Sequence, residues 1–340
     1  MTKSSGTILD GGSRPEGRDA GTEPRNALQD LENRIQVRLD GTVIGMRDLI
    51  RALVIAVVAR GHVLVEGPPG LGKTLLGKSL AAALSGRFTR IQGTADLMPA
   101  DITGVHVFDE TSHKFTLHPG PIFTDVLLVD EINRAGPKTQ SALLEAMAER
   151  QVTIDRKTYL LPPGFLVIAT QNPHEFEGTF PLPESQLDRF MMRMDVSFPG
   201  VEDEAAILGR YGTIAAVAAV AGDQAPGDIS AGQVDAAREC ADQVHVSPEL
   251  LTYILGIAKA SREQAQIALG ISTRGALALL LAARVAAGLR GSEFVTPDDV
   301  KLVAPWVVPH RLTLSSEAAL EGRTDRELTR AVLERVPVPR

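Results

Sequence analysis

The chain has little of several residue types, and each shortage narrows what the protein can be. Its 340 residues include one cysteine, Cys240, so no disulfide can form within the chain. Aromatic residues make up only 4%, so the hydrophobic cores must consist mainly of Ala, Leu, Val and Ile. The seven histidines are scattered and lack the His-Glu-x-x-His spacing of zinc enzymes, so no metallopeptidase pattern is present.

Long hydrophobic runs are also absent. The longest, Ala52–Ala59 and Ile214–Ala221, are far shorter than the ~20 residues that a membrane-spanning helix needs. Residues 1–25 are rich in Gly, Ser, Pro and charge and have no apolar segment of the secretory kind. We therefore expect a cytoplasmic protein without membrane insertion, preceded by a disordered tail over residues 1–27.

The charge balance is acidic. Lys and Arg number 35 against 42 Asp and Glu, which gives a formal net charge of −7. Such a balance provides no electrostatic footprint for a nucleic acid, so we expect no nucleic-acid partner, although a local basic groove stays open as an alternative.

One glycine-rich segment is the most informative pattern. It lies between an apolar run, residues 62–66, typical of a buried strand, and an Ala/Leu-rich run, residues 75–85, typical of a helix. In this context the G-x-x-x-x-G-K-[ST] pattern predicts a loop whose backbone N–H groups surround a phosphate. The alternative is a Gly/Pro turn between unrelated elements. The predicted nucleotide-binding residues here are Gly67, Pro68, Pro69, Gly70, Leu71, Gly72, Lys73, Thr74 and Leu75.

Two further apolar runs predict strands that are buried on both faces. They are Val126–Val129 and Phe165–Ala169, and the helical run Lys138–Glu149 lies between them. Strands that alternate with helices predict an α/β fold with a mainly parallel sheet. Ligands of such sheets bind beyond the carboxyl ends of the strands, where Asp130 and Asn172 follow these two runs.

The character of the chain changes after residue 200. From Val201 to Val303 it is Ala/Leu-rich with helical spacing, and we expect no strand there. This predicts a core domain over residues 28–199 and a helical domain over residues 200–340. A polar, broken stretch from Thr94 to Pro121 predicts a small excursion or hairpin inserted into the core.

Polar residues beyond the predicted strands suggest hydrolytic chemistry. Lys73 would reach the β and γ phosphates of a nucleotide, and Thr74 together with Asp130 would hold Mg²⁺. Glu131 would act as the general base, and the Asn172 amide would orient the attacking water. The alternatives are a surface turn or helix cap for the acidic pair, and a simple Asn-Pro turn for Asn172.

Two arginines are further candidates. Arg189 precedes the last predicted strand, and an arginine donated across a subunit boundary can stabilise charge on a transferring phosphate. Arg274 opens a helix of the second domain, where it would sense the γ-phosphate. The alternatives are a salt-bridged surface arginine for Arg189 and a solvated one for Arg274.

These residues together resemble those of the MoxR-type AAA+ ATPases. The resemblance runs from about Leu31 to the closing residues and is carried by dense blocks. Besides the phosphate loop, the blocks are Phe115–Phe123, Leu128–Ala135, Lys138–Met147, Ala169–Pro173 and Pro181–Phe190.

The resemblance implies a P-loop NTPase core of the αβα type followed by an all-helical lid, with ATP and Mg²⁺ as cofactors. It implies a homo-oligomeric ring, typically a hexamer, and a helix-2 insert near residues 96–115 that contacts a partner or lines the pore. MoxR relatives act as chaperones of proteins with von Willebrand factor A domains, in cofactor insertion or complex maturation. The implied roles are Walker A for Lys73 and Thr74, Walker B for Asp130 and Glu131, sensor 1 for Asn172, the arginine finger for Arg189, sensor 2 for Arg274, and adenine contact for Ile44 and Gly45.

Two departures and two rival functions stay open. The family's Ser-Pro-Arg-Ala is Ser-Thr-Arg-Gly at residues 272–275, which presents Arg274 less rigidly, and a turn where Asp-Gly is common has Asp155 and Arg156. One rival is a DNA-acting or magnesium-chelatase-like motor, which the acidic charge disfavours. The other is a nucleotide-switched binding module, which an intact Glu131 disfavours.

Overall fold

The computed structural model describes residues 24–40, 42–111, 113–172, 177–214, 227 and 229–339. Residues 1–23 of the predicted tail lie outside this part. Helix α1 (Pro24–Asp40) begins before the predicted end of the tail at residue 27. Within the described ranges, no helix has the length and apolar character needed to cross a bilayer.

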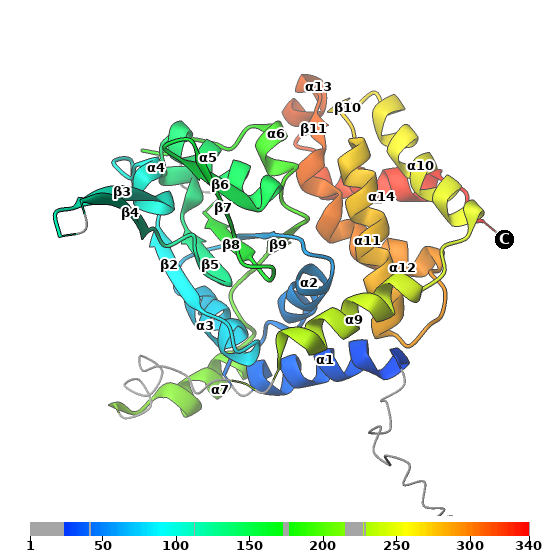
Figure 1. Ribbon diagram of the computed structural model, residues 1–340. Coiled ribbons are helices and arrows are strands. Elements are labelled where there is room, and N and C mark those ends of the chain that lie inside the picture. Colours follow the sequence, from blue (N-terminus) through cyan, green and yellow to red (C-terminus); the bar gives the residue numbers. More distant parts are fainter. Residues whose placement is uncertain are drawn as a thin grey trace, which may run out of the picture.

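A five-stranded parallel sheet forms the centre of the first half (Figure 1), as the alternating pattern predicted. Every pairing within it is parallel, in register from end to end. In spatial order the strands are β2 (Phe88–Gln92), β5 (Val126–Asp130), β8 (Leu166–Gln171), β1 (Val63–Glu66) and β9 (Met192–Asp195).

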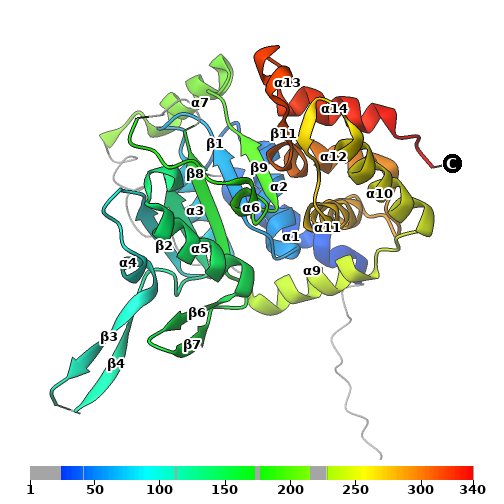
Figure 2. The ribbon, with the colours of Figure 1, turned by 90° about the horizontal axis from the view of Figure 1, so that it is seen from above.

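Both faces of the sheet are buried, which explains the continuous apolar runs. Successive side chains of a strand point to opposite faces, so Val126 and Leu128 enter one hydrophobic cluster while Leu127 and Val129 enter the other. Figures 1 and 2 show the layers on the two sides. The first cluster includes α1, α2 (Arg47–Val58) and α3 (Lys73–Ala83), and the second includes α4 (Pro99–Thr103) and α5 (Pro137–Glu149).

Two antiparallel hairpins extend from the α5 side (Figure 2). One pairs β3 (Gly104–Asp109) with β4 (Lys114–Pro119), and the other pairs β6 (Gln151–Ile154) with β7 (Lys157–Leu160). His106 joins them, because its Nδ1 lies 3.0 Å from Asp155 Oδ2 and its Nε2 lies 2.8 Å from Tyr159 Oη. The stretch Thr94–Pro121, where an excursion or hairpin was predicted, contains α4 followed by the β3–β4 hairpin.

Ser or Thr side chains cap the starts of most helices in the described part of the second half. Ser230, Ser247, Ser272, Thr296 and Thr324 each accept a hydrogen bond from a backbone N–H of the first turn. The helices are α7 (Val201–Tyr211), α9 (Ala231–Gln243), α10 (Pro248–Glu263), α11 (Thr273–Leu289), α12 (Pro297–Val307), α13 (Ser316–Leu320) and α14 (Asp325–Arg335).

The expectation of no strand between residues 201 and 303 was wrong at one place. Strand β10 (Ile267–Leu269) pairs antiparallel with β11 (Thr313–Leu314), which follows the short 3-10 helix η2 (Pro309–Arg311). A strand of three residues is too short to show an alternating pattern, and its partner is remote in sequence.

Helix α1 connects the two halves. Its buried side chains Leu28, Leu31, Ile35 and Leu39 belong to the cluster that extends from the sheet into the second half. Helix α11 lies close to it, because a Cβ on Gly288 would lie 2.4 Å from Leu28 Cδ1. Helix α1 therefore packs against helices from both halves.

Candidate active site

The loop between β1 and α3 has the conformation that its glycines predict. Gly67 has a φ of +155°, and a Cβ there would lie 2.3 Å from the Val196 carbonyl oxygen. Gly72 has a φ of +77° and directly precedes α3. The free N–H groups of the α3 N-terminus therefore face the loop, which is the arrangement that binds phosphate.

Lys73, the first residue of α3, lies over this loop. Its Nζ donates to the carbonyl oxygens of Gly67 at 2.9 Å and Pro68 at 3.1 Å. Burial lowers the pKa of Lys73, and the nearby Asp130 and Glu131 carboxylates act in the opposite direction. A cation beside a glycine-rich anion loop favours a polyphosphate ligand.

Asp130 ends β5 with both carboxylate oxygens occupied. Oδ1 accepts from Thr170 Oγ1 at 3.1 Å, and Oδ2 accepts from Arg90 Nε at 2.6 Å. Thr74 Oγ1 lies 3.5 Å from Oδ2. A hydroxyl and a carboxylate are hard oxygen donors, so Thr74 and Asp130 fit the ligand preference of Mg²⁺.

Glu131 has a left-handed backbone conformation, with φ 54° and ψ 52°. Its N–H donates to Thr170 Oγ1 at 3.0 Å, and its carboxylate accepts from Gln92 Nε2 at 2.8 Å and lies 3.2 Å from Arg134 Nε. Gly93 has no room for a Cβ, which would lie 2.2 Å from the Glu131 carbonyl oxygen. A non-glycine residue in this conformation costs free energy and persists only where its surroundings hold it in place. Such residues are common at functional sites.

A polar cavity of about 190 Å³ brings most of the predicted hydrolytic residues together. Asn172 lines it from the end of β8, while Pro173–Phe176 lie outside the described residues. Four residues that the sequence pattern did not predict also line it: Arg90, Gln92, Thr170 and Gln171. The predicted residues on its wall are Gly67, Pro69, Gly70, Gly72, Lys73, Thr74, Asp130, Glu131 and Asn172.

A larger, mostly apolar cavity of about 930 Å³ lies against the other side of the loop. Ile44, Leu71, Leu75 and Tyr211 contribute to its wall, and Tyr211 Oη donates to the Thr42 carbonyl oxygen. Gly45 lies in the neighbouring hollow, where a Cβ would lie 2.8 Å from Asp203 Oδ2. Apolar walls next to a phosphate loop fit a flat heterocycle such as adenine.

Two predicted site residues line neither of these two cavities. Arg189 Nη1 donates to the Leu144 carbonyl oxygen of α5 at 2.6 Å. Arg274 is 58% exposed at the start of α11, and its Nη1 lies 4.0 Å from Asp188 Oδ2. Within one chain the structure therefore does not bring these arginines to Lys73 and Glu131.

Comparisons with known proteins identify the family. A model of the ATPase family associated with various cellular activities (AAA) matches residues 62–192, and a model of the AAA lid domain matches residues 259–332. The uncharacterized protein YeaC of Bacillus subtilis is 39% identical over 312 residues, which are 92% of this chain and 96% of YeaC. Chaperone MoxR1 of Mycobacterium tuberculosis is 38% identical over 306 residues, 87% of this chain and 79% of MoxR1.

A solved structure gives the same answer. It is described as a putative ATPase from Cytophaga hutchinsonii, and it matches with a TM-score of 0.83 at 36% identity, covering 93% of this chain and 96% of that one. The parallel sheet, the phosphate loop and the helical second half agree with these relatives. The chain therefore belongs to the MoxR family of AAA+ proteins and is an ATPase.

Proposed function

We propose that this ATPase is a ring-forming, cytoplasmic chaperone that remodels or activates a partner carrying a von Willebrand factor A domain, in cofactor insertion or complex maturation. The single observation that supports a site shared between subunits is that Arg189 does not line the cavity that contains the other hydrolytic residues. Lys73, Asp130, Glu131 and Asn172 share one cavity, whereas Arg189 of the same chain lies outside it. A second subunit that contributes Arg189 across a boundary would complete the site.

In this proposal the larger cavity takes the adenine and the glycine loop takes the phosphates. Ile44 and Gly45 contact the base, and Lys73 binds the β and γ phosphates. Thr74 and Asp130 would hold Mg²⁺, which when bound neutralises charge on the phosphate oxygens. The core, residues 28–199, and the lid, residues 200–340, close over the nucleotide.

The hydrolytic step then uses groups of this chain. Glu131 accepts a proton from a water that Asn172 orients, and the water oxygen forms a bond to the γ-phosphorus. The bond from that phosphorus to the bridging oxygen breaks, so that ADP and phosphate leave. Gln92 Nε2 donates to one carboxylate oxygen of Glu131, Oε2, so this contact orients the carboxylate and leaves Oε1 to accept the proton.

The β3–β4 hairpin is the proposed contact with the partner. Phe108 and Phe115 pair edge to face at 5.3 Å between ring centroids, and they are 47% and 67% exposed. Exposed aromatic pairs on a projecting hairpin favour a protein surface as their partner. Replacing Phe115 with Ser should weaken binding to a von Willebrand factor A domain protein of the same organism, measured by calorimetry, and leave ATP hydrolysis unchanged.

The test of the shared site is a mixing experiment. ATP hydrolysis is measured against protein concentration for the wild type, for Arg189→Ala, for Glu131→Gln and for a mixture of both variants. We expect specific activity to rise steeply with concentration, and the mixture to regain activity that neither variant has alone. Flat specific activity without rescue would refute the ring and favour the nucleotide-switched binding module.

A further inference from the structure

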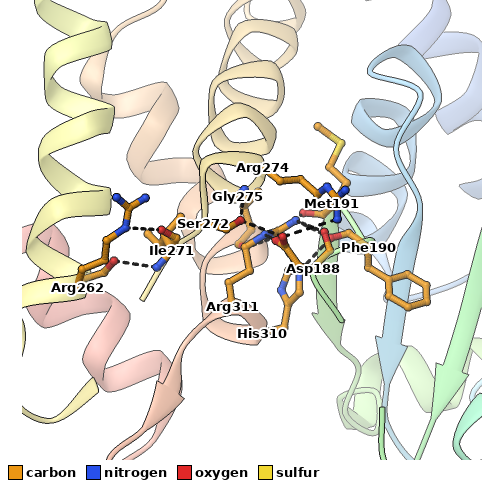
Figure 3. A network of polar contacts seen from close by, with 12 residues as sticks. Asp188, Phe190, Met191, Arg262, Ile271, Ser272, Arg274, Gly275, His310 and Arg311 are labelled. Atoms are coloured by element: carbon orange, nitrogen blue, oxygen red, sulfur yellow. Dashed lines mark hydrogen bonds and ion pairs between the residues drawn. The ribbon is translucent and has the colours of Figure 1, made fainter. Parts of the chain in front are cut away.

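A buried arginine from the second half holds the segment around Arg189 (Figure 3). Arg311 lies in η2, and its side chain is only 2% exposed. Its Nε donates to Asp188 Oδ1 at 2.7 Å, and its terminal nitrogens donate to the carbonyl oxygens of Phe190 at 2.7 Å and Met191 at 3.1 Å. One guanidinium therefore binds the chain on both sides of Arg189.

The Asp188 carboxylate is the counter-charge of the Arg311 guanidinium. Burial lowers the pKa of Arg311, and the Asp188 carboxylate acts in the opposite direction. A buried cation is tolerated where a partner charge and several acceptors surround it. A lysine offers one point charge where arginine offers a planar fork of five N–H donors, so lysine cannot reach these three residues together.

The same carboxylate also binds the start of α11. Ser272 Oγ donates to Asp188 Oδ2 at 2.9 Å, while it caps α11 by accepting from the Gly275 N–H at 2.9 Å. Any residue larger than glycine at position 275 would clash with Arg311, because a Cβ there would lie 2.6 Å from Arg311 Cδ. The absence of a side chain at Gly275 thus leaves room for the buried arginine.

We propose that Arg311 is a positioning residue for Arg189, and that the Ser272–Asp188 hydrogen bond makes the placement of Arg189 depend on where the lid helix α11 lies. A lid that moves when its own subunit binds nucleotide then shifts the arginine offered to the neighbouring subunit. The inference rests on the proposed shared site. Its alternative is that the contact only holds the two halves of one chain together.

The experiment measures rescue in trans, where the donor's own hydrolysis has been removed. Acceptor subunits carry Arg189→Ala, and donor subunits carry Glu131→Gln, so the only active sites pair an acceptor's Glu131 with a donor's Arg189. The test donor adds Arg311→Lys. The matched control donor adds Arg193→Lys, because Arg193 is 13% exposed and also links β9 to the second half through Asp325, but has no hydrogen bond to residues 188–191.

We expect the Arg311→Lys donor to lose about tenfold or more of the rescued kcat with KM unchanged, since small displacements of a group that stabilises the transition state are costly. The Arg193→Lys donor should rescue activity as well as the unmodified donor does, although its loss of thermal stability is similar to that of the Arg311→Lys donor. Equal rescue by both donors would overturn the proposal. If the unmodified Glu131→Gln donor gives no rescue, the shared site itself is refuted, and this inference with it.

A second donor keeps the test decisive if Arg311→Lys does not fold. Ser272→Gly removes the hydrogen bond to Asp188 and keeps most of the helix start, because glycine is itself tolerated well at the N-cap position. Ser272→Thr retains both hydrogen bonds and is its control. Severalfold weaker rescue by the glycine donor than by the threonine donor supports the link to α11, and equal rescue by the two refutes it.

Discussion

A buried histidine gives the most quantitative prediction. His62 precedes β1 and is 4% exposed. Its Nδ1 accepts from the Val167 N–H at 3.0 Å, so the proton lies on Nε2, which donates to the Met147 carbonyl oxygen at 3.2 Å. Burial, together with the positive charge of Arg150, lowers the pKa of His62 to about 3.

The size of the effect follows from linkage. Above pH 6.5 the imidazole is neutral in both the folded and the unfolded chain, so its contribution to stability does not change. Below that value the unfolded chain takes up a proton that the folded chain refuses, and stability falls by about 1.4 kcal/mol per pH unit. Between pH 7.5 and pH 5.0 this one group removes about 2 kcal/mol from the free energy of unfolding.

The assay is urea unfolding at these two pH values. The variant His62→Gln lacks the titrating group, so its free energy of unfolding should fall by about 2 kcal/mol less than that of the wild type between pH 7.5 and 5.0. The same substitution at the exposed His118 is the matched control variant. An equal pH dependence in His62→Gln and the wild type would refute the reasoning.

Three further predictions follow from the site and its surroundings. Glu131→Gln should slow hydrolysis by about 10²–10⁴-fold while a fluorescent ATP analogue still binds, because only the general base is lost; normal turnover would remove Glu131 from that role. Arg90→Gln should lower the Mg²⁺ concentration that gives half-maximal analogue binding, because it removes a positive charge 2.6 Å from Asp130; an unchanged or higher concentration contradicts this. Arg156 has a φ of +71° in the β6–β7 turn, a backbone conformation that glycine adopts more readily than arginine. Arg156→Gly should therefore raise the free energy of unfolding, measured with urea, by about 0.5–1 kcal/mol. A less stable variant would contradict this.

The parts of the site that the sequence predicted are those built from neighbouring residues. The phosphate loop and the acidic pair each follow a strand within a few residues, so the local pattern contains both the side chain and the element that holds it. Arg90 and Gln92 were missed because their role depends on strand pairing. Gln92 lies opposite Asp130 only after β2 pairs with β5, and those strands are separated in the sequence by α4 and a hairpin.

The contact between Arg311 and Asp188 was out of reach for a different reason. These residues are 123 positions apart, and an arginine before a short strand gives no sign that it is buried. Separation in sequence also hid the positions of Arg189, whose partner Leu144 is 45 residues away, and of Arg274, whose neighbour Asp188 lies in the other half. The sequence shows both arginines, but it does not show that Arg189 donates to the Leu144 carbonyl oxygen or that Arg274 lies near the Asp188 carboxylate.

The position of α1 has a consequence for synthesis on the ribosome. Its apolar side, with Leu28 and Ile35, is completed by α9 and α11, whose last residues lie about 200–260 positions later. At about 5–20 residues per second, part of that side waits on the order of tens of seconds for its partners. The nascent chain therefore exposes part of the apolar side of α1 until α9 and α11 have been synthesised, and during that time this side is open to binding by other proteins.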